Sequence, residues 1–211
     1  SGKSLLLPIN MLDMKKIITA IIATALLAIP TVALTKATKS AKNGLLEVSF
    51  NYQRQPGPGS NQYAVWIEND KGEVVKTLFV TSFTTKGRTR GNEQPMRGYI
   101  KRPACVPTWV KVSKANDLSD EQLDAFTGAT PQANGIQTFT WDFTDQEGKA
   151  VGEGTYKVFV EATLFNASTI TYSGTFSTHD AAGSITLTSQ LTEPDEQHKD
   201  MVTDVKARII N

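Results

Sequence analysis

Apolar residues recur at every second position along much of this chain, and that period most constrains its fold. Residues Leu46 to Tyr52 alternate Leu, Val, Phe and Tyr with polar side chains. The stretches Tyr63 to Ile67 and Val74 to Val80 are also strand-like, and Asn69-Asp70-Lys71-Gly72 between them is suited to a hairpin turn. Period two indicates a strand with one buried face, whereas an amphipathic helix repeats about every 3.6 residues. We therefore expect an all-β protein built from antiparallel strands.

The rest of the chain continues this pattern. Further strands are expected at residues 137–143, 154–162, 170–176, 184–188 and 202–209. Val110 and Val112 indicate another short strand. Many short strands at this spacing are typical of an antiparallel sandwich. A helical pattern is clear only near residues 119–126, which predicts a β-sandwich with one short helix.

A turn and two aromatic residues in the second half of the chain favour the same fold. Asp145 and Gly148 are suited to a tight turn, while Trp141 and Tyr156 are suited to packing between two sheets. The stretch resembles the Ig-like repeat of flagellar hook-capping and related secreted modules. That pattern, W-D-x-x-D-x-x-G-x-x-V-x-x-G-x-Y, is matched by Trp141-Asp142, Asp145, Gly148, Val151, Gly154 and Tyr156. The resemblance implies an Ig-like antiparallel β-sandwich and carries no information about function.

The N-terminal residues have the pattern of an export signal. Met14-Lys15-Lys16 is positively charged, Ile17 to Ile29 is mostly apolar, and a small-residue exit ends at Ala33. The apolar run is shorter than the ~20 residues that a transmembrane helix needs. We expect cleavage after Ala33, so that residues 1–33 are a leader and signal peptide and residues 34–211 form a single sandwich domain. The product is expected to be periplasmic or otherwise extracytoplasmic, and not membrane-spanning after cleavage.

Charge and composition argue against several classes of function. The net charge is +1, whereas nucleic-acid-binding proteins usually carry a strongly basic surface. The chain has only two histidines, and no set of acid, base and nucleophile is visible, so we expect no enzymatic activity. The single cysteine, Cys105, is expected to be a small buried residue, because an internal disulfide needs two thiols.

The heptapeptide Asp124-Ala125-Phe126-Thr127-Gly128-Ala129-Thr130 is the strongest candidate for a functional site. Gly128 permits a positive φ and the close approach of another protein, and Ala129 leaves that approach open. Thr130 supplies a hydroxyl, which a partner enzyme has to activate before it acts as a nucleophile. Asp124 lies one helical turn before the glycine, where it is able to orient the loop.

This heptapeptide resembles the signature D-x-x-[S/T]-G-A-T, at which a flavin transferase of the ApbE type esterifies a threonine hydroxyl with the phosphate of FMN. The resemblance implies that Thr130 carries a covalent FMN, with Asp124, Thr127 and Gly128 completing the cofactor site. It also implies two partners, the flavin transferase and a membrane oxidoreductase that exchanges electrons with the flavin. The function implied is extracytoplasmic electron transfer.

The same residues have a purely structural interpretation. Ser119 is a suitable N-cap for a short helix with acidic residues in its first turn, and Gly128 is then the stop at its C-terminus. A protein without a cofactor would be a module that binds another protein or a glycan through sheet edges or loops. The sequence leaves both interpretations open.

Most of the chain after the signal also resembles a family of predicted periplasmic proteins called domain of unknown function 2271. The matching pieces are Asn61–Glu68, Val75–Phe79, Arg102-Pro103, Pro107–Trp109, and Thr127–Thr130 leading into Trp141-Asp142. Members of that family tend to be found beside flavin transferases and PepSY-type membrane oxidoreductases. The resemblance therefore implies the same two partners for this chain.

The segment 86–102 is basic, with six lysines and arginines against one glutamate. Arginine is well suited to phosphate because its guanidinium presents forked donors. A basic loop beside a flavin is able to hold its phosphate or to stabilise a reduced, anionic flavin. The alternative is an ordinary solvated surface loop, which is the commoner fate of a charge cluster.

Overall fold

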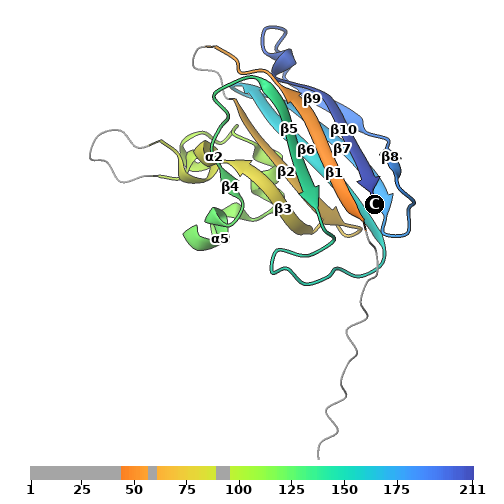
Figure 1. Cartoon of the computed structure of the whole chain (residues 1–211). Helices are drawn as coiled ribbons and strands as arrows, with labels where there is room; N and C mark the ends of the chain where they lie inside the picture. Colours follow the sequence, from red (N-terminus) through yellow and green to blue (C-terminus); the bar gives the residue numbers. More distant parts are fainter. Residues whose placement is uncertain (1–43, 57–60, 89–95) are drawn as a thin grey trace, which may run out of the picture. The chain divides into compact units, whose positions relative to one another are not determined.

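The computed structural model describes residues 44–56, 61–88 and 96–211, so the expected leader and signal peptide at 1–33 lies outside the described residues. The strands are β1 (Leu45–Tyr52), β2 (Gln62–Asn69), β3 (Val74–Thr81), β4 (Thr127–Gly128), β5 (Gly135–Trp141), β6 (Thr155–Phe165), β7 (Ser168–Ser177), β8 (Gly183–Ile185), β9 (Thr188–Thr192) and β10 (Val202–Ile210). They form a four-stranded sheet of order β5-β1-β10-β8 and a six-stranded sheet of order β4-β3-β2-β6-β7-β9. The two sheets pack together in a sandwich-like arrangement, as the alternating pattern predicts (Figure 1).

The main core lies between the two sheets. Every second residue of β1 is buried, from Leu46 to Tyr52, which confirms the period-two prediction. Trp141 and Tyr156 also meet in this core, with their ring centroids 5.4 Å apart. The predicted turn between them is present, because Gly148 has φ 80° and its N–H donates to the carbonyl of Asp145. The Ig-like assignment itself stays a prediction.

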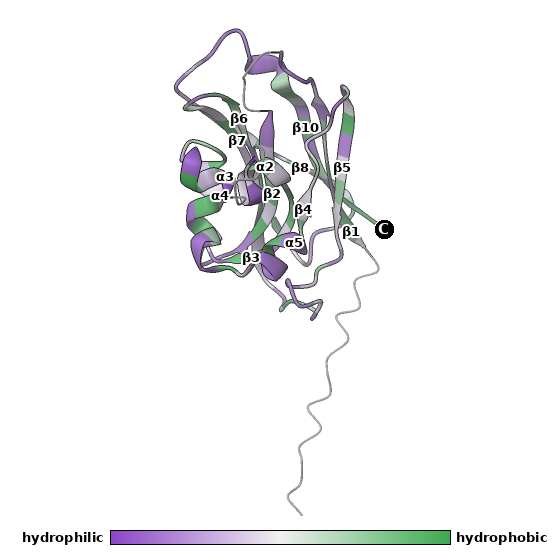
Figure 2. Ribbon diagram, turned by 90° about the vertical axis from the view of Figure 1, so that its left-hand side faces the viewer, coloured by the Kyte–Doolittle hydropathy of each residue, from purple (hydrophilic) through white to green (hydrophobic). Residues whose placement is uncertain are grey.

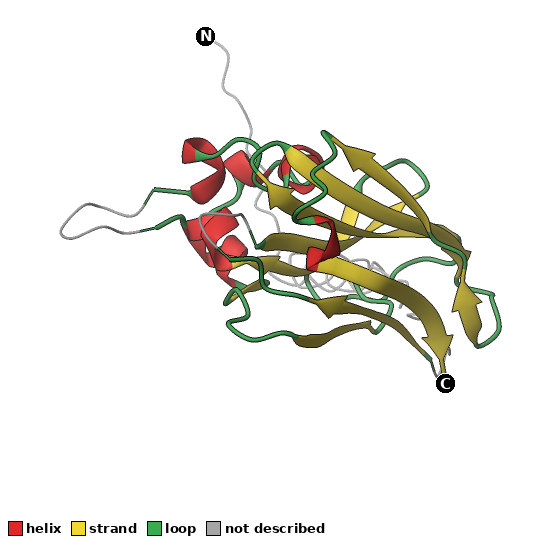
Figure 3. Cartoon of the chain, turned by 90° about the horizontal axis from the view of Figure 1, so that it is seen from above, coloured by secondary structure: helices red, strands yellow, loops and turns green. Residues whose placement is uncertain are grey.

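A layer of short helices covers the outer face of the six-stranded sheet. The described residues form α2 (Ser82–Lys86), α3 (Gly98–Lys101), α4 (Pro107–Val112), α5 (Asp120–Asp124) and two 3₁₀ turns, η1 (Ala115–Asp117) and η2 (Lys199–Met201). Figure 2 shows α3 and α4 on the side of this sheet that faces away from β1, β5 and β10. Figure 3 shows most of the helices gathered at one side of the strands.

The expectation of a single helix near 119–126 is therefore incomplete, and the expected strand at Val110 and Val112 is wrong. Both valines belong to the α4 region, which begins with Pro107 at its first turn. Proline favours that position because its fixed φ suits a helix and its missing N–H is not needed there. The short helix at 119–126 is present as α5, with Ser119 as its N-cap.

The helical layer exists because β2 is apolar on both faces. Seven of its eight positions are buried. Tyr63, Val65 and Ile67 face the core between the sheets, whereas Ala64 and Trp66 face the helices. Such a strand needs cover on both sides, as strands of sheets packed on two faces do.

A buried carboxylate fastens the helical layer to the sheet. Glu161 on β6 is fully buried, and its two oxygens accept the backbone N–H groups of Thr108 and Trp109 at 3.0 and 2.9 Å. Two residues further along β6, Thr163 accepts the N–H of Val106 at 2.8 Å. Burial raises the pKa of the Glu161 carboxyl, while the two backbone donors oppose that rise. The start of α4 is thus held by side chains of β6.

We expect Glu161→Gln to change the pH dependence of stability. A raised folded-state pKa means that the carboxyl contributes stability below its unfolded pKa, and that this contribution is lost as pH rises through the folded pKa. Wild type should therefore gain stability relative to Glu161→Gln as the pH falls through the raised pKa of the folded state towards the ordinary range of a carboxyl group. At neutral pH the variant should lose about 1–3 kcal/mol, because one buried N–H loses its acceptor. Urea unfolding of both proteins at several pH values measures this, and parallel pH profiles would contradict it.

Candidate functional site

The candidate heptapeptide begins in α5 and ends beyond the edge of the six-stranded sheet. Ser119 and Gln122 form a reciprocal capping box at the start of α5, which confirms the predicted N-cap. The helix ends at Asp124, and Ala125 is its C-cap. The chain then enters β4, which pairs in parallel with β3, unlike the antiparallel pairing of the other strands.

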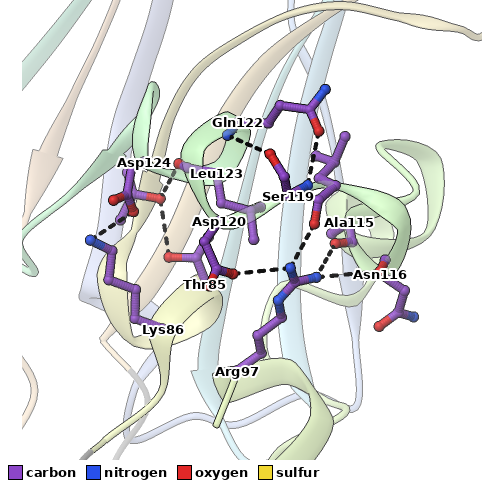
Figure 4. Close-up of polar contacts among 12 residues, drawn as sticks. Thr85, Lys86, Arg97, Ala115, Asn116, Ser119, Asp120, Gln122, Leu123 and Asp124 are labelled. Atoms are coloured by element: carbon purple, nitrogen blue, oxygen red, sulfur yellow. Dashed lines mark hydrogen bonds and ion pairs between the residues drawn. The ribbon is translucent and has the colours of Figure 1, made fainter. Parts of the chain in front are cut away.

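The first half of the heptapeptide anchors it to α2. Asp124 forms an ion pair with Lys86 at 2.7 Å, with both side chains more than half exposed (Figure 4). The hydroxyl of Thr127 donates to the carbonyl of Leu123 at 2.6 Å and lies 3.0 Å from the hydroxyl of Thr85. An exposed ion pair contributes only about 0–1 kcal/mol. The half-buried Thr127 is therefore the firmer of the two anchors.

Gly128 has a different structural role from the one that the sequence predicts. It does not have a positive φ and it does not end the helix; it lies in β4 opposite Thr81. A Cβ atom at this position would lie 2.1 Å from the Phe79 ring. Glycine is required because an aromatic side chain of β3 packs against its backbone.

Gly128→Ala is expected to destabilise the protein by about 1–3 kcal/mol, the usual cost of forcing a methyl group into a packed site. Urea unfolding measures the loss. Gly152→Ala is a matched control, because a Cβ there meets nothing within 4 Å and its φ is outside the left-handed region. Equal effects at the two glycines would mean that the contact with Phe79 does not explain Gly128.

The second half of the heptapeptide presents Thr130 at the end of the sheet. Ala129 is exposed and Thr130 is half-buried. The Thr130 hydroxyl accepts a long hydrogen bond of 3.4 Å from the Gln62 amide, at the first residue of β2. Its carbonyl accepts from the Gln132 amide at 2.8 Å. The hydroxyl therefore lies at the margin of the sandwich and outside its packed core.

The residues after Thr130 are fastened to the end of β1. The carbonyl of Pro131 accepts from Arg54 Nη1 at 3.1 Å and from the Tyr52 hydroxyl at 3.4 Å. The backbone N–H of Arg54 donates to Asn134 Oδ1 at 2.8 Å. Arg54 and Gln62 were not predicted as site residues. They lie far from Thr130 in sequence, so only the tertiary fold brings them to it.

Two cations of the basic segment 86–102 are engaged in structural contacts. Lys86 pairs with Asp124, and the Arg97 guanidinium donates to the carbonyls of Ala115, Asn116 and Leu118 and to Asp120 (Figure 4). These two pairs flank a cavity of about 360 Å³ between α2 and α5. Its two cations are balanced by two carboxylates, so it has no net charge to attract phosphate. Residues 89–95 of the basic segment lie outside the described residues.

Cys105 is confirmed as a buried residue. It is fully inaccessible, and its Sγ lies 3.0 Å from the Thr84 hydroxyl. Burial raises the pKa of the thiol to about 11, so it is protonated at neutral pH. A protonated, buried thiol is a poor nucleophile.

The part of the chain that the structure describes has neither a cluster of metal-ligating side chains nor a helix able to cross a membrane. There, no three His, Cys, Asp or Glu side chains lie close enough together to hold a metal ion. Within the same residues, no helix has the length and hydropathy needed to cross a membrane.

Comparison with known proteins gives one match. The model of a family described as "Predicted periplasmic protein (DUF2271)" matches residues 46–190, a range that includes the whole heptapeptide from Asp124 to Thr130. No curated protein and no solved structure matches the chain.

Proposed function

The chain belongs to the DUF2271 family of predicted periplasmic proteins, and from that premise we propose that it is a non-enzymatic carrier of one FMN, attached covalently to Thr130. One observation carries this proposal. Thr130, the last residue of the acceptor-like heptapeptide, is half-buried at the margin of the sandwich, on a segment whose two ends are tied to the fold.

The residues around Thr130 fit such a group. Ala129 is small and exposed, so it does not obstruct the approach of a modifying enzyme. Thr127 and Gly128 fix the chain before Thr130, and Pro131 is held after it. A substrate segment held in one conformation loses less entropy on docking than a flexible one.

The modification is a phosphoryl-type transfer from a flavin dinucleotide. A bond forms between Thr130 Oγ1 and the phosphorus of the FMN half, the P–O–P bond breaks, AMP leaves, and the hydroxyl proton passes to the transferase. The threonine hydroxyl needs activation, which the transferase has to provide. Attached FMN supplies electron transfer, while the residues of this chain hold and expose it. A flavin transferase and a membrane oxidoreductase are the proposed partners.

The direct test is intact-mass spectrometry of the protein after export together with a flavin transferase. We expect a mass gain of one FMN less water, together with a yellow colour. Protein exported without the transferase is the control and should show neither. No mass gain in the presence of an active transferase would overturn the proposed function.

A second candidate is a cofactor-free binding module, and β9 favours it. This strand lies at the edge of the six-stranded sheet, and all of its residues are exposed. An open edge offers unpaired backbone groups to a partner strand. This function predicts a colourless protein in its native host and a partner that is lost when Ser189 or Leu191 is replaced by proline.

A further inference from the structure

We propose that Arg54 binds the phosphate of a phosphodiester on Thr130, with Gln62 as a second donor. This inference rests on the proposed function and adds to it the residues that would hold the group. Three segments meet here: Arg54 just after β1, Gln62 at the start of β2, and the loop after β4 that carries Thr130.

Arg54 is already oriented towards this loop. Its backbone N–H donates to Asn134 at 2.8 Å, and its Nη1 donates to the Pro131 carbonyl at 3.1 Å. Both partners belong to the segment that directly follows Thr130. The Arg54 guanidinium is therefore bonded to the residue next to Thr130. The backbone and the side chain of Arg54 are held by different partners.

The base of the Arg54 loop is also fixed. Asn61 accepts the N–H of Gln55 at 2.7 Å and donates to the carbonyl of the same residue at 3.0 Å. Its Oδ1 also accepts from the Tyr52 hydroxyl at 3.3 Å. These bonds join Asn61 to Tyr52 and Gln55, which lie on either side of Arg54 in the sequence, so the backbone that carries Arg54 is held in place.

The chemistry of a phosphodiester suits this arrangement. The diester keeps one negative charge, shared by its two non-bridging oxygens. Arginine presents several N–H donors in a planar fork that matches such oxygens, and charge-assisted bonds of this kind are stronger than bonds to a neutral carbonyl. The present partner of Arg54 Nη1 is a neutral carbonyl, so a phosphate oxygen beside it is the better acceptor.

Gln62 is placed to contribute the second donor. Its amide already donates to Thr130 Oγ1 over 3.4 Å, and Gln62 itself is almost fully buried. Once Oγ1 becomes an ester oxygen, the charged non-bridging oxygens on the adjacent phosphorus are the stronger acceptors. Two cations of the basic segment, Lys86 and Arg97, are held by carboxylates at α5. Arg54, which lies outside that segment, is the cation that contacts the residue after Thr130.

The experiment compares wild type, Arg54→Gln and Arg54→Lys after export with the transferase, with Lys206→Gln as the control for loss of an exposed cation elsewhere. Intact mass gives the modified fraction. Urea unfolding at low and high salt is then measured for the modified and unmodified forms of each protein, and ³¹P NMR reports the environment of the ester.

At low salt, we expect modification to increase the ratio of folded to unfolded molecules by roughly two- to fivefold in wild type and in Lys206→Gln, which is the range for an exposed ion pair. High salt should reduce this gain. Arg54→Gln should lose this stabilisation and shift the ³¹P resonance. Arg54→Lys should keep part of the stabilisation, because lysine keeps the positive charge but lacks the forked donors of arginine.

The outcomes separate the two proposals. If wild type gains no mass, the proposed function fails and this inference fails with it. If wild type gains mass but Arg54→Gln shows the same stabilisation and the same ³¹P resonance, only the assignment of Arg54 is overturned. A third outcome is that Arg54→Gln is folded by circular dichroism but is not modified, whereas Lys206→Gln is modified. The guanidinium is then needed during transfer of the phosphate, which supports the assignment.

Discussion

Thr130→Ala is expected to abolish the mass gain that export with a flavin transferase produces. The oxygen that forms the ester is then absent, because alanine has no side-chain hydroxyl. Stability should change by no more than about 0.5 kcal/mol, because the lost side chain is only half-buried and its hydrogen bond is long. Intact mass together with urea unfolding separates loss of modification from loss of folding.

Thr127→Ala is the matched control for that experiment. It removes a hydroxyl from the same heptapeptide but leaves Thr130 in place, so a substantial mass gain should remain. Its cost should be to stability, by about 0.5–2 kcal/mol, because Thr127 bonds to Leu123 and Thr85. A mass gain that survives Thr130→Ala, or one that is lost only in Thr127→Ala, would place the attachment elsewhere.

The largest loss of stability is expected for Trp109→Ala, at about 3–5 kcal/mol. Trp109 is fully buried between α4 and the six-stranded sheet, where its indole N–H donates to Thr77 at 3.1 Å and its ring meets the edge of Phe126. Its removal leaves a cavity under the helical layer and an unpaired threonine hydroxyl. The free energy of unfolding in urea measures the effect.

Trp109→Phe tests how that loss is divided. Phenylalanine keeps an aromatic ring in the layer but cannot donate to Thr77, so it should lose clearly less than alanine does. A loss below about 1 kcal/mol in Trp109→Ala would mean that the helical layer adds little to stability. It would then be a covering that unfolds separately from the two sheets.

The strands were predictable because their environment is simple. In β1 and β10, one face meets the core and the other is more exposed, and the side chains alternate accordingly. The turn at Gly148 and the helix start at Ser119 were predictable for a similar reason, since each depends on residues only a few positions apart. Local physics was enough in these places.

The helical layer was missed because its signal is spread over distant parts of the chain. The clue was present in β2, where Ala64 and Trp66 make the second face apolar, but period two alone does not say what covers that face. In α4, Val110 and Val112 matched a strand, while Pro107 and Trp109 in fact mark a helix start and its buried side. Helices of this length are set by tertiary packing more than by propensity.

For the candidate site, the sequence singled out the Thr130 hydroxyl but not its surroundings. Thr130 lies beyond the end of β4, as expected for a residue that another protein has to reach. Gly128 is required by the close contact with the Phe79 ring and not by a positive φ. Arg54 and Gln62 have no local pattern that links them to Thr130. Whether Thr130 carries FMN stays a prediction for the mass measurement.

The parallel pairing of β3 with β4 also has a consequence for the order of events after export. A parallel neighbour has to be reached by a crossover, and here the intervening chain contains α2 to α5. Only two residues of β4 are paired, and their contacts with Thr85 and Phe79 come from distant parts of the sequence. A short synthetic copy of the heptapeptide would lack this geometry, and a nascent chain would acquire it late. An enzyme that recognises this folded geometry would modify folded molecules and leave incompletely folded ones unmodified. Attachment of the cofactor would then depend on completed folding.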